Sequence, residues 1–141
     1  MWLRYETSIA TLVQFVVGTA LTFLTGLASI ISGCRTSTGA DCVGNTFVSL
    51  LLIIMVVVGY GFLLGVGYFA QDKRSSKLAL LLIGSEAVAA LIFLFDARQA
   101  PGLIDKFTNG LSFLIALWVA YIAFNLYRAR GARIVRKRNS L

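Results

Sequence analysis

Four long apolar runs follow one another along the 141-residue chain, separated by short polar segments. They cover residues 9–31, 47–70, 78–95 and 107–127. Each run approaches the roughly 20 residues that a helix needs to cross about 30 Å of hydrocarbon. In lipid a helix satisfies its own backbone hydrogen bonds, whereas four strands are too few to close a barrel. The pattern therefore predicts an all-α integral membrane protein with four transmembrane helices.

The short segments between the runs predict how these helices are connected. They cover residues 32–46, 71–77 and 96–106, and such short connections favour antiparallel neighbours. We therefore expect an up-down-up-down antiparallel bundle over residues 1–127, followed by a basic cytoplasmic tail over residues 128–141. A hydrophobic content of 58% and a mean hydropathy of +0.84 also exclude an ordinary water-soluble domain.

Lys and Arg are distributed unevenly between the two sides of this predicted bundle. Ten of the 13 fall on the side of the termini: Arg4, Lys73, Arg74, Lys77, Arg128, Arg130, Arg133, Arg136, Lys137 and Arg138. The other side has Arg35, Arg98 and Lys106. Because short basic segments stay in the cytoplasm, both termini are predicted to be cytoplasmic. A bacterial inner membrane, or an equivalent one, fits the small size and the charge bias.

The basic segment 128–138 has two interpretations. It sets the orientation of the last helix, or it also attracts anionic lipid headgroups, at about 1 kcal/mol per basic residue near the surface. Nucleic acid is not an expected partner, because this segment has no aromatic side chain to stack on bases.

The residue inventory excludes several kinds of enzyme. The chain has no histidine and two cysteines, so one copy cannot supply the usual four zinc ligands or an imidazole base. Gly59, Gly61, Gly65 and Gly67 lie close together but lack the Lys-Ser/Thr of a phosphate-binding loop. We therefore expect no catalytic residue, metal or cofactor, and we do not predict an enzyme.

Cys34 and Cys42 fall in the first predicted connection, outside the cytoplasm, where disulfides persist. The polar, glycine-containing segment between them can bend back, so the two cysteines are predicted to bond to each other. The simple interpretation is a covalent staple. The alternative is thiol–disulfide chemistry, although the chain has no CxxC motif.

One face of the first predicted helix carries small and polar residues along its length. At 100° per residue they fall within an arc of about 80°: Thr11, Gln14, Gly18, Thr22, Thr25, Ser29 and Ser32. Polar groups in hydrocarbon must face protein or water, so this face is predicted to point inward. It serves either close helix packing or the lining of a polar pathway.

Two glycines in the second predicted helix have the spacing of a helix contact. Gly61 and Gly65 form a GxxxG pattern, which lets another helix approach closely. The pattern predicts either a contact within the bundle or a contact between two copies.

Glu86 is the one ionisable acid or base deep inside a predicted span, near the bilayer midplane. A bare carboxylate in hydrocarbon is costly, so Glu86 must be protonated, hydrogen-bonded or hydrated. Matching depths between antiparallel helices gives a set of candidate donors for an intramembrane polar site: Thr19, Thr22, Tyr60 and Trp118. Glu86 is either a functional acid or a structural hydrogen-bonding residue.

Three functions follow as hypotheses. The first is a structural or accessory component that assembles helices in a membrane complex or homo-oligomer. The alternative is a small transporter or channel for ions or protons that uses Glu86. The second alternative is a membrane thiol–disulfide protein that uses Cys34 and Cys42.

Overall fold

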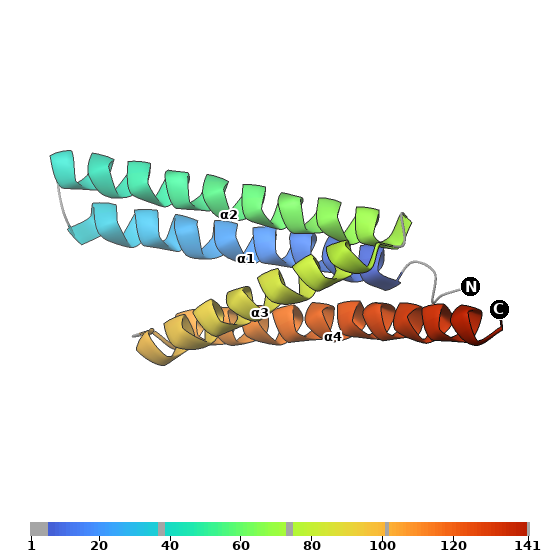
Figure 1. The fold of residues 1–141 in the computed structure, drawn as a ribbon. Coiled ribbons are helices and arrows are strands. Elements are labelled where there is room, and N and C mark those ends of the chain that lie inside the picture. The colour runs from blue at the N-terminus through green and yellow to red at the C-terminus, as the bar shows by residue number, and fades with distance from the viewer. Residues whose placement is uncertain (1–5, 37–38, 73–74, 101, 141) are drawn as a thin grey trace.

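The computed structural model describes residues 6–36, 39–72, 75–100 and 102–140, and these form four helices in chain order (Figure 1). The helices are α1 Glu6–Thr36, α2 Ala40–Asp72, α3 Ser76–Gln99 and α4 Leu103–Asn139. All four are long and apolar enough to cross a membrane. The prediction of an all-helical chain with four helices of this kind is confirmed for the described residues.

The helices extend beyond the apolar runs, so the predicted connections were too long. Most of 32–46 is helical: α1 continues to Thr36 and α2 begins at Ala40. The basic segment after residue 127 is helical as well, as the last part of α4. Hydropathy marks where hydrocarbon contact ends, whereas helical hydrogen bonding continues through polar residues with adequate helix propensity. Arg4, Lys73 and Arg74, which enter the charge comparison, lie outside the described residues.

The bundle consists of two helical hairpins. α1 packs mainly on α2, and α3 packs mainly on α4, with smaller contacts between α1 and α4 and between α2 and α3. Figure 1 shows that successive helices run in opposite directions and that both ends of the chain lie at the same end of the bundle. α3 runs obliquely from the α1–α2 hairpin toward the start of α4. The hairpins therefore meet at the end of the termini and diverge at the opposite end.

The apolar core lies toward the end where the hairpins meet. Its buried side chains come from all four helices: Ala10, Val66, Leu82, Val119 and Ala123. Ala10 follows the start of α1 by about one turn, and Val66 precedes the end of α2 by less than two turns. The core thus closes this half of the bundle.

Hydrogen bonds between helices also hold this end of the bundle together. The first N–H groups and last C=O groups of a helix have no partner within it. Here the Gln71 side-chain oxygen accepts the backbone N–H groups of Thr7 and Ser8 at 3.0 and 3.3 Å. Arg130 Nη2 donates to the Ala70 carbonyl at 2.7 Å. These bonds tie α2 to the start of α1 and to the last third of α4.

A disulfide joins α1 to α2 at the opposite end. Cys34 lies in the last turn of α1 and Cys42 in the first turn of α2, with Cα atoms 4.7 Å apart. Gly39, between the two helices, has φ of +85°. Glycine adopts this left-handed backbone without steric cost, and this permits the tight reversal.

The disulfide can be tested by the reaction of the two cysteines with maleimide. Protein prepared from its native membrane and unfolded in detergent without reductant should take up no maleimide, because both sulfur atoms are bonded. After reduction it should take up two per chain, read by intact-mass spectrometry. Two labels without reductant would show that the cysteines are free thiols in the native protein.

Candidate functional site

Glu86 lies on the buried face of α3. It is fully buried, and it shares its face with Ala79, Leu82 and Ala90, which are also buried. Their spacing of three to four residues places them on one side of the helix. The carboxyl group is therefore turned toward the other helices and away from the apolar outer surface of α3.

The partner of Glu86 is an amide on α1. Gln14 Nε2 donates to Glu86 Oε2 at 2.7 Å, and the Gln14 side chain is 2% exposed. The two residues are 72 positions apart in sequence, so this bond connects the two hairpins directly. It is the buried polar link between α1 and α3.

Each member of this pair has one oxygen that takes no part in the bond between them. Glu86 Oε1 and Gln14 Oε1 are buried and have no hydrogen-bond partner among the described residues. Both atoms are acceptors, and a buried acceptor without a donor costs about 1–3 kcal/mol. A proton on the carboxyl group, or a bound cation, supplies what these oxygens lack.

Tyr60 of α2 lies beside this pair. Its side chain is 7% exposed, and it lies near Glu86 and near Ser112 of α4. The ring occupies the space that a side chain at Gly18 would need, because a Cβ there would be 2.5 Å from Tyr60 Cζ. The glycine on α1 thus leaves room for the tyrosine ring beside Glu86.

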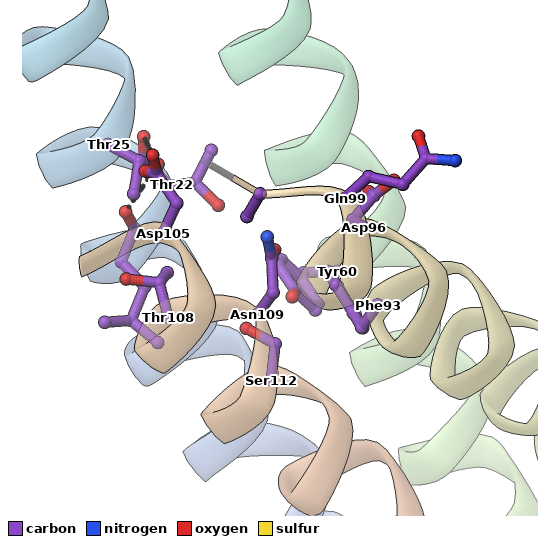
Figure 2. Close-up of a pocket in the computed structure, with 12 residues that line it drawn as sticks. Thr22, Thr25, Tyr60, Phe93, Asp96, Gln99, Asp105, Thr108, Asn109 and Ser112 are labelled. Carbon is purple, nitrogen blue, oxygen red and sulfur yellow. Dashed lines mark hydrogen bonds between the residues drawn. The ribbon is translucent and has the colours of Figure 1, made fainter. Parts of the chain in front are cut away.

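A cleft of about 410 Å³ opens between the diverging hairpins, and Tyr60 is part of its lining. Figure 2 shows side chains entering this cleft from several helices. Its lining combines hydroxyl, amide, carboxylate and apolar groups: Leu21, Thr22, Thr25, Tyr60, Phe93, Asp96, Gln99, Ala100, Asp105, Thr108, Asn109 and Ser112. Among the described residues, no Lys or Arg belongs to this lining. The cleft is therefore polar and acidic.

The core, the buried pair and the cleft follow one another along the bundle. On α3 the order is Leu82 in the core, then Glu86, then Phe93 and Asp96 in the cleft. At 1.5 Å per residue, Asp96 lies about 15 Å beyond Glu86 along the helix axis. Along α3, Glu86 thus lies between the apolar core and the polar cleft.

The polar face predicted on α1 is divided between these regions. Thr11, Gln14 and Gly18 are buried, whereas Ser29 is exposed. Further along, Thr22 and Thr25 line the cleft, and their hydroxyls donate to carbonyl groups of α1 itself at 2.7 and 2.9 Å. These threonines therefore make the α1 side of the cleft polar. Among the described residues, their hydroxyl groups donate within α1 and not to another helix.

Among the described residues, the donor to Glu86 is not one of the four predicted candidates, although Tyr60 lies near it. The observed donor is Gln14, which the sequence placed on the polar face but not at the carboxyl group. Thr22 bonds within α1, Thr19 Oγ1 has no partner among the described residues, and the Trp118 side chain is 44% exposed. The comparison of depths assumed that all helix axes are parallel to one another. Because α3 runs obliquely, its residues lie beside other residues of α1 than this assumption gives (Figure 1).

The tight contact between α1 and α2 does not use the predicted glycine pair. A Cβ at Gly61 would make an ordinary contact with Phe15 at 3.8 Å, and one at Gly65 would have nothing within 4 Å among the described atoms. The close approaches are made instead by Gly18 against Tyr60, Gly26 against Ile53 and Gly67 against Thr11. A role of Gly61 and Gly65 between two copies stays a prediction.

The cleft was not expected from the sequence, although a periodic signal exists. Asp105, Thr108, Asn109 and Ser112 are spaced as one face at the start of α4. Residues so close to a predicted membrane boundary are ordinarily interpreted as interfacial. The divergence of the two hairpins, which a local pattern does not encode, is what brings them together with α1 and α3.

Comparison with protein-family models, curated proteins and solved structures finds no match to this chain. The functional interpretation therefore rests on the residues and the geometry described above.

Proposed function

We propose that the chain crosses a membrane as an up-down-up-down antiparallel bundle with both termini in the cytoplasm. Two observations support this orientation. Large apolar side chains are exposed along all four helices, as a lipid-facing surface requires. Ten of the 13 basic residues belong to the segments at the end of the termini. In this orientation the cleft opens away from the cytoplasm.

We further propose that the protein is a small transporter or channel for protons or small cations, with Glu86 as the ion-binding group. The observation that carries this proposal is the Gln14–Glu86 pair, whose two remaining oxygens are buried acceptors without donors in the described chain. A structural pair would be expected to satisfy both oxygens internally. Intramembrane acids that face a bundle interior commonly mark ion or proton pathways.

The surrounding residues suit this role. The acidic cleft raises the local concentration of cations at the open end, because its charged lining residues, Asp96 and Asp105, are both carboxylates. Tyr60 lines the cleft and lies near Glu86, so its hydroxyl can pass a proton or contact a cation. The apolar core below excludes ions, so release toward the cytoplasm requires the two hairpins to move relative to each other.

The test is flux through proteoliposomes that contain the purified chain. Glu86→Gln keeps the size and the hydrogen-bonding ability of the side chain but removes its acid. We expect cation or proton flux driven by a pH gradient to fall to the rate of protein-free vesicles. Asp41→Asn is the matched control, because Asp41 is an exposed acid at the start of α2, outside the cleft lining. Wild-type flux in a folded Glu86→Gln variant would overturn the proposal.

A second proposal is the accessory role, in which the bundle docks onto another copy or a larger assembly. It is favoured by a mostly apolar groove of about 470 Å³ on the α1–α2 surface, lined by Ser8, Leu12, Gly61, Leu64, Gly65 and Tyr68. Replacing Gly61 and Gly65 by leucine fills this groove. If the groove holds a partner helix, the oligomer seen by chemical crosslinking in native membranes should dissociate, and an unchanged oligomer would contradict the role.

A further inference from the structure

We propose that the cleft between the two hairpins binds a protonated primary amine with a small apolar body. The proposal deepens the transport function and rests on it, because the ligand would approach Glu86 through the same cleft. Charge, hydrogen-bonding groups and shape each carry part of the argument.

The charge of the cleft selects a cation. Asp96 near the end of α3 and Asp105 in the first turn of α4 are its charged lining residues. Figure 2 shows them entering from opposite sides, with Asn109 and Ser112 between them toward the floor. A positive group placed centrally would interact with both carboxylates, whereas an anion would meet repulsion from both sides.

The hydrogen-bonding groups favour an ammonium over a fully substituted cation. Besides the carboxylates, the lining offers the amide oxygen of Asn109 and the hydroxyl oxygen of Ser112. A primary ammonium carries three N–H donors and no acceptor, which complements a wall rich in oxygen acceptors. Hydrogen bonds between an ammonium and carboxylates are also about twice as strong as neutral ones.

The shape and the apolar residues indicate that the ligand has a body beyond its charged group. The cleft volume of about 410 Å³ lies in the range of small-molecule sites and exceeds what a bare ion fills. Leu21, Phe93 and Ala100 supply apolar surface. The aromatic rings of Phe93 and Tyr60 can also contact a cation through their faces.

The test is binding of 2-phenylethylammonium to the purified full-length chain in lipid nanodiscs, measured by equilibrium dialysis at neutral pH. We expect saturable binding of one ligand per chain. Asp96→Asn and Asp105→Asn should each weaken it by about tenfold, because each removes one of the charges that hold the cation. Asp41→Asn, which removes an exposed acid outside the cleft lining, should leave binding unchanged.

Competition separates amine recognition from apolar partitioning. 2-Phenylethanol has a similar shape without the charge, so it should compete at least about a hundredfold less well than the amine if both carboxylates contribute. Equal competition, absent saturable binding, or equal affinity in the Asp96→Asn/Asp105→Asn variant would each overturn the inference. These outcomes are independent of ion flux: loss of flux in Glu86→Gln without amine binding would leave the transport proposal standing alone.

Discussion

Replacing Gln14 by leucine is expected to lower the free energy of unfolding by about 2 kcal/mol. The substitution keeps the volume of the side chain but removes the amide that donates to Glu86 Oε2 at 2.7 Å. The carboxyl group then stays fully buried without its donor from α1. The measurement is the midpoint of unfolding by sodium dodecyl sulfate in mixed micelles, followed by far-UV circular dichroism.

The matched control removes both partners. In the Gln14→Leu/Glu86→Leu variant no polar group of the pair remains, so most of the lost stability should return. The two single substitutions should therefore be strongly non-additive, as expected for residues in direct contact. If Gln14→Leu leaves stability unchanged, or if the double variant loses the sum of the single effects, the pair is not the link between the hairpins that we describe.

Gly67→Ala is expected to be destabilising by about 2 kcal/mol, because it overpacks a closed contact. A Cβ at this position would lie 2.5 Å from Thr11 Cγ2 and 2.6 Å from Thr11 Oγ1. Threonine is β-branched and stiff in a helix, so Thr11 cannot rotate away without cost. The same detergent unfolding assay measures the effect, and Thr11→Ala in the same chain should relieve it.

Gly65→Ala is the control, half a turn away on the same helix. A Cβ there would have nothing within 4 Å among the described atoms, so alanine should be neutral or stabilising by up to about 1 kcal/mol through its higher helix propensity. Equal destabilisation at the two glycines would contradict the arrangement of α1 on α2. Destabilisation at Gly65 alone would indicate a partner in the outer groove.

The sequence predicted those parts of the fold that depend on local pattern. Apolar length located the four helices, and helical periodicity indicated that the face bearing Gln14 and Gly18 points inward. The solvation cost of a carboxyl group in hydrocarbon identified Glu86 as a buried residue. These are properties of single helices, so they can be derived without knowing how the helices cross.

The partners of these residues depend on the crossing of helices and could not be derived in the same way. Gln14 reaches Glu86 because α3 is oblique, and Tyr60 comes close because Gly18 leaves space for its ring. The cleft likewise exists because the hairpins diverge at one end only. Asp96 and Asp105 look like ordinary interfacial acids in the sequence and face a shared space only in the folded chain.

In the proposed function, water and cations reach the middle of the bundle through the cleft, from the side opposite the termini. Thr22→Cys places a thiol deep in the cleft wall, and Leu24→Cys places one at similar depth on a surface that is 66% exposed in the isolated chain and faces lipid in our account. The native disulfide keeps Cys34 and Cys42 unreactive. These variants allow access to be measured at two matched positions.

The decisive measurement is therefore the rate at which a small, charged, membrane-impermeant thiosulfonate labels each variant in oriented vesicles. We expect fast labelling of Thr22→Cys from the face opposite the termini and none from the face of the termini. Leu24→Cys should not be labelled from either face. Labelling of Thr22→Cys only from the face of the termini, or equal inertness at both positions, would contradict the proposed function.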